Sequence, residues 1–162
     1  MSPLLPNLGS PIANTHDPIP HADQMQLLKA LEEAAKQFPD GRLPPEAIDQ
    51  VAKENGRPRT HAWAAIALNP NLQPQLTTDT LFALCVGQCQ LQGAIPNLEK
   101  LLELRDQQIA NQETHFDIVP RHCLDMCPHA PVAISRSPHG QAAHPKLEPE
   151  TVSEIINALC SS

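Results

Sequence analysis

The chain has 162 residues, enough for one ordinary domain or for a small domain with a helical appendage. Its formal net charge of −7 argues against nucleic acid or an anionic membrane surface as a partner. The longest apolar run covers only 62–68, far less than the roughly 20 residues of a membrane-spanning helix. We therefore expect no nucleic acid as partner and no membrane insertion.

The first 22 residues have the composition of an unstructured lead-in. Many of the 18 prolines fall there, among Asn, Gly and Ser and without sustained periodicity. This stretch lacks the basic and apolar regions of a secretory signal, and it lacks the Arg of a mitochondrial presequence. We expect a disordered, Pro-rich tail over 1–22 and a cytoplasmic protein.

Three short helices are predicted within 23–76, where apolar residues recur at intervals of three and four. The first covers 23–38, with Asp23 as its N-cap. The second covers 45–56 and has a proline in its first turn, and the third ends before Pro70. The residues predicted to face inward are Met25, Leu28, Leu31, Ala35, Phe38, Ile48, Val51, Ala52, Trp63, Ile66 and Ala67.

After Pro74 the pattern changes to that of a small α/β layer, which we place at 77–162. The predicted elements, in chain order, are a strand over 80–86, a long helix over 95–109, strands over 116–119, 131–135 and 141–145, and a closing helix over 152–159. The spacing of Thr151 and Glu154 predicts a capping box at the last helix. This order of elements resembles a thioredoxin-like fold.

Five cysteines in a cytoplasmic protein need an explanation that does not involve a disulfide framework. Four of them form two C-x3-C pairs, Cys85 with Cys89 and Cys123 with Cys127. Both pairs are predicted in loops at strand ends, where four thiolates can converge on one metal site. A [2Fe-2S] cluster uses four thiolates, and so does a structural zinc, whose pairs are usually the tighter C-x2-C. A redox disulfide or inert buried thiols would also account for the cysteines.

Several stretches along about 43–160 carry a family resemblance. The cysteine loops read CVGQCQLQGA (85–94) and CLDMCPHAPV (123–132), and the other stretches are LPPEAIDQVA (43–52), GRP (56–58), WAAI (63–66) and HPKLEPE (144–150). In this order they resemble the thioredoxin-like [2Fe-2S] ferredoxin family, to which the small iron–sulfur subunit of NADH:quinone oxidoreductase belongs. The resemblance implies a thioredoxin-like α/β domain preceded by a short helical segment.

The resemblance also implies a function. It implies that Cys85, Cys89, Cys123 and Cys127 bind a [2Fe-2S] cluster and that the chain is a one-electron carrier. Its partner would be a flavin-containing NAD(P)H dehydrogenase subunit or a related oxidoreductase. Neither a nucleophile with a matched base nor a phosphate-binding loop is found in the sequence, so substrate chemistry would belong to that partner. The alternative is a zinc-stabilised interaction module without redox activity, and the sequence is compatible with a homodimer.

Three positions depart from the family pattern. The first cysteine pair is separated by three residues instead of four, Leu68-Asn69 replaces an aromatic Phe-Tyr pair, and Asp125 replaces a glycine. These departures bear on the identity of the partner.

Other residues near the cysteines are expected in supporting roles. His122 and His129 are expected to be surface or hydrogen-bonding groups near the metal, since four thiolates are already present. Cys160 has no paired cysteine and is expected to be an ordinary thiol. The acidic surplus is expected to be a solvated helix face that is also suited to docking a basic partner.

Overall fold

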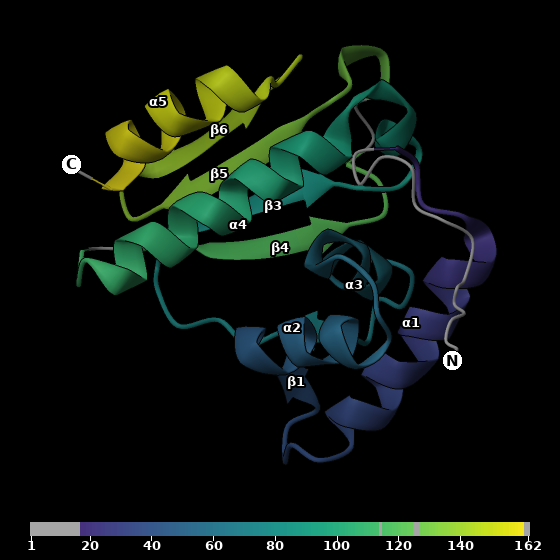
Figure 1. Ribbon diagram of the computed structural model, residues 1–162. Helices are drawn as coiled ribbons and strands as arrows, with labels where there is room; N and C mark the ends of the chain where they lie inside the picture. Colours follow the sequence, from purple (N-terminus) through teal and green to yellow (C-terminus); the bar gives the residue numbers. More distant parts are fainter. Residues whose placement is uncertain (1–16, 114, 125–126, 161–162) are drawn as a thin grey trace.

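The computed structural model describes residues 17–113, 115–124 and 127–160, apart from the side chains of residues 88 and 127 (Figure 1). A helical segment comes first, and a four-stranded sheet with two covering helices follows it. One hydrophobic core runs through both parts, from Leu27 in the first helix through Trp63 and Phe82 to Val152 in the last helix. No helix in the described ranges has both the length and the apolar content to cross a membrane.

The helical segment contains α1 (His21–Ala35), α2 (Pro45–Glu54) and α3 (Arg59–Ile66). The three predicted helices are thereby confirmed, although the first ends three residues earlier than predicted. Two short strands, β1 (Arg42–Leu43) and β2 (Gln73–Pro74), pair in parallel beside them. The sequence did not predict this pair, because two-residue strands carry no periodicity.

The start of α1 differs from the prediction. Pro20 precedes the helix, and Asp23 lies buried in its first turn instead of capping it. The Arg57 guanidinium donates to Asp23 Oδ1 over 3.0 Å, so the carboxylate joins α1 to the residues just before α3. Ile19 is buried as well, and His21 and Ala22 lie in α1, so the predicted tail does not extend to residue 22. The remaining predicted tail, residues 1–16, lies outside the described residues.

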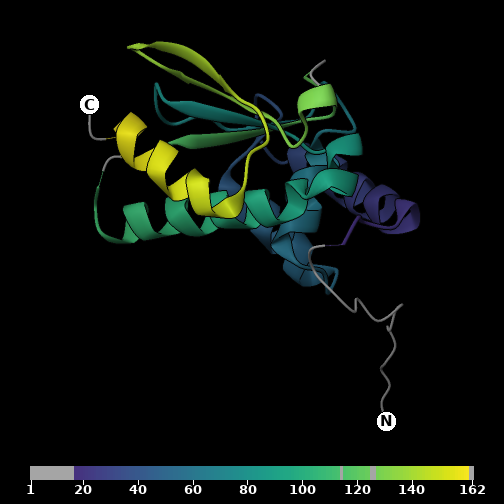
Figure 2. The same ribbon diagram turned by 90° about the horizontal axis from the view of Figure 1, so that it is seen from above.

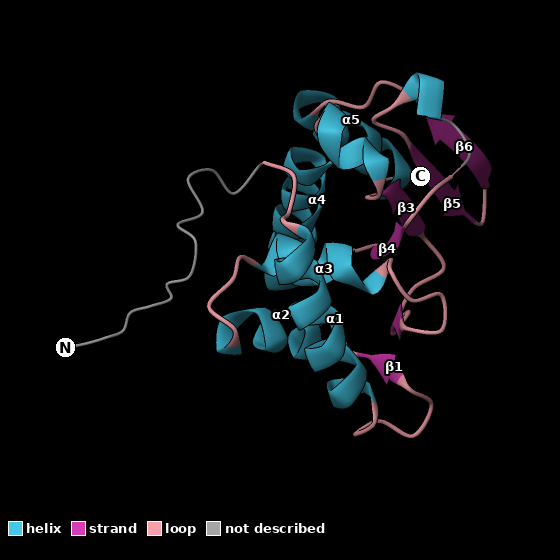
Figure 3. Ribbon diagram, turned by 90° about the vertical axis from the view of Figure 1, so that its right-hand side faces the viewer, coloured by secondary structure: helices cyan, strands magenta, loops and turns pink. Residues whose placement is uncertain are grey.

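The sheet contains β3 (Leu81–Cys85), β4 (Asp117–Arg121), β5 (Ala133–Ser137) and β6 (Gly140–His144) in the spatial order β4-β3-β5-β6. The β3–β4 pair is parallel and the other two are antiparallel. A parallel pair needs a crossover, and α4 (Ala94–Ala110) provides it. Together with α5 (Pro149–Cys160) it covers one face of the sheet (Figures 2 and 3). The predicted α/β, thioredoxin-like fold is confirmed.

The predicted capping box of α5 is wrong. The helix begins at Pro149, so Thr151 is its third residue and not its N-cap. The Thr151 hydroxyl donates to the Glu148 carbonyl oxygen (2.9 Å) and accepts the Glu148 N–H (3.4 Å). A side chain in the first turn thus reaches back to the residue before the helix, which is the second half of a capping box.

Candidate metal centre

The edge of the sheet at the end of β3 brings both cysteine loops together. Cys85 is the last residue of β3, and its register partner on the parallel strand β4 is Arg121. Cys123, which begins the second loop, lies only two residues beyond Arg121. Because parallel strands end at the same edge of a sheet, both cysteine loops begin at this edge. The Cys85 thiol donates to the His122 carbonyl oxygen at 3.5 Å. The first predicted ligand therefore touches the backbone that leads to the third.

Gly87, between the first two cysteines, lies directly against the second loop. A Cβ atom added there would overlap the His122 carbonyl oxygen and lie 3.0 Å from His122 Nδ1. Any side chain at position 87 would therefore collide with the backbone of the second loop, so the glycine is required for space. The absence of a side chain at this position lets the two loops meet.

Cys89 lies in a short 3-10 helix, η2 (Gln88–Gln92), which leads through Gly93 into α4. Only 2% of Cys85 and 1% of Cys89 are exposed. These two side chains form a small apolar cluster, separate from the main core, with residues from the far end of the second loop. The other members are Ala94, Ala130 and Val132, with Leu124 packed against them. The surroundings of the first pair are thus contributed by both loops.

The second loop begins at Cys123, whose side chain is exposed. Cys127 opens a second 3-10 helix, η3 (Cys127–His129), and its side chain lies outside the described part of the chain, as does the departure at Asp125. The Lys146 N–H donates to the His129 carbonyl oxygen (2.8 Å), and Lys146 Nζ donates to that of Pro128 (3.2 Å). The connection between β6 and α5 therefore holds the η3 turn in place.

An N-terminal contact that sequence reasoning missed supports the first loop. The Gln90 side chain accepts the Ile19 N–H on Oε1 (2.9 Å), and its Nε2 donates to the Val86 carbonyl oxygen (2.6 Å). Gln90 is buried, and it joins the residues before α1 to both ends of the first cysteine loop. A single isoleucine among prolines has no periodicity, so no local pattern could have revealed this contact.

The donor chemistry fits a group bound by thiolates. Two buried thiols come from one loop and one exposed thiol from the other, and the loop backbones touch through Gly87 and His122. Within the described side chains, no three of the His, Cys, Asp and Glu residues are already grouped closely enough to hold a metal ion. The Cys127 side chain is not among them, so the four-cysteine ligand set remains a prediction.

Cys160 lies far from the two loops. Its thiol is near Gln108 Oε1 (3.9 Å), towards the end of α4, whereas Cys89 lies in η2, before the start of that helix. Fourteen residues of helix between Ala94 and Gln108 correspond to about 20 Å. Burial raises the pKa of the Cys160 thiol above its ordinary value, which disfavours the thiolate that metals require.

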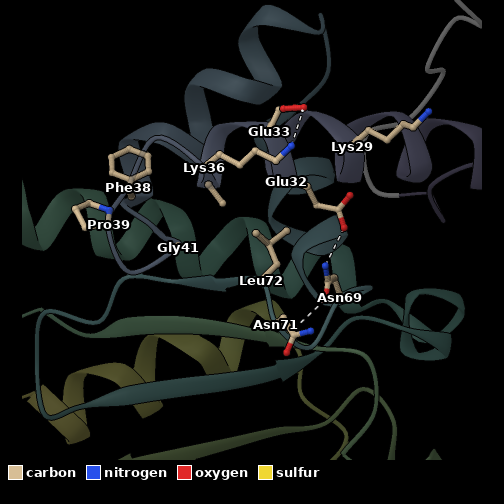
Figure 4. Close-up of a pocket in the computed structure, with 11 residues that line it drawn as sticks. Lys29, Glu32, Glu33, Lys36, Phe38, Pro39, Gly41, Asn69, Asn71 and Leu72 are labelled. Carbon is tan, nitrogen blue, oxygen red and sulfur yellow. Dashed lines mark hydrogen bonds and ion pairs between the residues drawn. The ribbon is translucent and has the colours of Figure 1, made fainter.

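A concavity of about 810 Å³ lies in the helical segment, away from the cysteines (Figure 4). It lies between α1 and the turn after α3. Glu32 accepts a hydrogen bond from Asn69 (2.8 Å), and Glu33 forms an ion pair with Lys36 (3.2 Å). None of the described residues that line it is a Cys or His, so it has no link to the predicted metal chemistry.

The comparison with protein families agrees with this geometry. A family model described as thioredoxin-like [2Fe-2S] ferredoxin matches residues 12–160, which includes the helical segment and both cysteine loops. No curated protein matches the chain. Members of this family bind a [2Fe-2S] cluster and carry electrons within oxidoreductase systems. The chain belongs to the thioredoxin-like [2Fe-2S] ferredoxin family.

Proposed function

We propose that Cys85, Cys89, Cys123 and Cys127 hold the [2Fe-2S] cluster and that the chain passes single electrons to or from a partner protein. The observation that carries this proposal is the meeting of the two loops, where the Cys85 thiol touches the His122 backbone and Gly87 leaves room for the approach. Four thiolates are the complete ligand set of such a cluster, which supplies reversible one-electron oxidation and reduction when bound.

The exposure of the cysteines suits a carrier. Cys85 and Cys89 are buried among apolar side chains and exclude water from one side of the site, whereas Cys123 lies at the surface. Apolar surroundings and backbone donors are the means by which a protein sets a cluster potential. An electron needs a short path to the surface but no shaped substrate pocket, which agrees with the lack of catalytic groups in the sequence.

The proposed partner is a flavin-containing NAD(P)H dehydrogenase subunit or a related oxidoreductase in the cytoplasm. A reducing compartment keeps thiols available as metal ligands. Leu68 and Asn69, which replace the aromatic pair of the family pattern, line the same groove as Cys123. The departure thus lies on the surface nearest the exposed ligand, where it would alter the choice of partner.

The test is reduction of the purified protein by NADH or NADPH in the presence of candidate flavoproteins from the same cell, followed by visible absorbance. We expect a red-brown protein that bleaches when one of these flavoproteins is added with its nucleotide. Rapid reduction by another class of donor, with every flavoprotein inactive, would contradict the flavin partner. A colourless protein with one bound zinc would contradict the redox function itself.

A further inference from the structure

The surface around Cys123 differs in charge from the chain as a whole. The chain has a net charge of −7, yet Arg121, Arg136 and Lys146 are exposed beside the second cysteine loop. Arg121 lies two residues before Cys123, and Lys146 contacts the η3 turn. Arg136 pairs with Leu81, at the other end of β3 from Cys85, and lines a groove that reaches Cys123. We call these three residues the basic edge.

Two grooves meet at Cys123, and Arg121 lines both. One groove, of about 400 Å³, lies on the face of the sheet that α4 and α5 leave uncovered, and Arg136 lines it as well. Its remaining lining is mostly apolar and consists of Leu81, Ala83, Leu124, Ile134 and Gln141. The other groove, of about 440 Å³, extends from Cys123 to the turn after α3. An incoming surface would therefore meet cationic groups and apolar contact area beside an exposed ligand.

Within the described part of the chain, no carboxylate neutralises the positive charges of the two arginines. Neither Arg121 nor Arg136 forms an ion pair with any carboxylate of the described residues. The described residues that line the two grooves include no Asp or Glu. By contrast, Arg57, Arg59 and Arg105 are paired with carboxylates of α1, α4 and β4, respectively. The helices α4 and α5, on the opposite side of the sheet, together carry five acidic and two basic side chains.

We propose that the electron-transfer partner docks on the basic edge through an acidic surface of its own. This inference rests on the proposed function and specifies the partner's chemistry. At physiological salt the Debye length is about 8 Å, so charges at the contact outweigh the more distant surplus. Opposite charge at the contact speeds encounter and fixes orientation. The net charge led us to expect a basic partner, whereas the charges around Cys123 favour an acidic one.

The first test is direct binding of a labelled deca-glutamate peptide, measured by fluorescence anisotropy at low salt. The double variant Arg121→Gln/Arg136→Gln removes two charges from the basic edge. Arg42→Gln/Lys53→Gln is the matched control, since it removes two exposed positive charges from the helical segment. We expect the edge variant to bind about tenfold more weakly, at the low end of electrostatic steering effects, and the control to bind like the wild type. Equal weakening in both would overturn the proposal.

The second test measures electron transfer with charged oxidants. The oxidant is either anionic tris(oxalato)cobaltate(III) or cationic hexaamminecobalt(III). The dithionite-reduced protein transfers one electron to the complex, whose cobalt(III) becomes cobalt(II). We expect oxidation by the anionic complex to slow with added salt and in the edge variant. A faster reaction with the cationic complex, or an anionic rate unchanged in the edge variant, would contradict the basic edge.

Two further outcomes separate an acidic docking partner from competing explanations. If the protein has no visible chromophore, the proposed function fails, while deca-glutamate binding still reports on the basic edge. If a single-stranded oligonucleotide binds more tightly than deca-glutamate and depends on the same two arginines, an acidic protein surface is the wrong occupant.

Discussion

At the scale of single residues, the proposed cluster depends on which cysteines are ligands. We expect Cys123→Ala to lose most of the visible absorption, because an iron without one thiolate must recruit water or a weaker ligand. Cys160→Ser should keep the wild-type spectrum, since that thiol lies about 20 Å along α4 from the first loop. Absorption spectra of the two variants, purified without oxygen, check this prediction. A Cys160→Ser protein without colour would show that the ligands are misassigned.

Gly87 tests the contact between the loops. In Gly87→Ala the new methyl group would overlap the His122 carbonyl oxygen, so the two loops must move apart. We expect a loss of about 1–3 kcal/mol in the free energy of unfolding, as for other overpacked sites, and a lower iron content.

Gly56→Ala is the control for Gly87→Ala. Gly56 has open space around it but a φ of +65°, so that substitution costs only backbone strain of about 1 kcal/mol. Urea denaturation and iron analysis compare the two variants. Equal iron content in both would refute the steric role of Gly87.

His144 gives the fold a dependence on pH. Its ring stacks on Phe82, with centroids 5.5 Å apart, and lies 2.8 Å from Ser135 Oγ. Burial lowers the pKa of His144 below its ordinary value. The folded state therefore binds fewer protons there than the unfolded state, and stability falls as the pH drops below about 6.5. In His144→Gln we expect urea midpoints to fall less between pH 7 and pH 5 than in the wild type, and an equal fall would contradict this.

At the scale of elements, Asp117 joins the connection before β3 and the helix α4 to the strand β4. This residue of β4 is 2% exposed and accepts the backbone N–H groups of Thr77 and Thr78 at 2.7 Å each. The Arg105 guanidinium from α4 also reaches it, at 3.5 Å. We expect Asp117→Ala to lower the free energy of unfolding by about 3–5 kcal/mol, because it leaves a buried guanidinium without its partner.

The matched control for Asp117→Ala is Arg59→Gln. It removes ion pairs with Asp106 and Asp49, whose side chains are 54% and 39% exposed. Such surface pairs contribute about 0–1 kcal/mol, so the control should differ little from the wild type. Urea unfolding curves at one pH compare the two. A smaller loss in Asp117→Ala than in Arg59→Gln would refute the role of Asp117.

Periodicity in the sequence predicted the larger elements but not their ends. The helix α2 buries one face and the strand β3 is buried along most of its length, so both have clear apolar patterns. Both lie close to where they were predicted. The β1–β2 pair and the Gln90–Ile19 contact depend on residues distant in sequence, so local patterns did not reveal them. At α5 the motif spacing was present, but the proline two residues earlier already starts the helix.

The candidate site was predicted to the level of its loops. Two C-x3-C pairs at strand ends indicated convergence, and the structure brings Cys85 to the backbone beside Cys123. Composition alone did not show that Gly87 is needed for the approach, because a glycine between two cysteines also fits an ordinary turn. The charge around Cys123 was hidden as well, since net charge does not report which side chains share a surface.

At the scale of the whole molecule, the fold separates two tasks. The cysteine loops lie at one edge of the sheet. The helices α4 and α5 cover one face of the sheet, and the helical segment packs beside β4 (Figures 1 and 3). The N-terminal residues contact the first loop through Gln90, so the segment before the ferredoxin domain is part of the same folded unit. This arrangement leaves Cys123 and the basic edge accessible for a partner.

The central claim is that this chain binds one [2Fe-2S] cluster through its four paired cysteines. The most direct measurement is iron, acid-labile sulfide and zinc per chain in protein purified without oxygen. We predict two irons, two sulfides and no zinc, because two cysteine pairs supply two thiolates for each iron. Four irons per chain, or one zinc with neither iron nor sulfide, would contradict that claim.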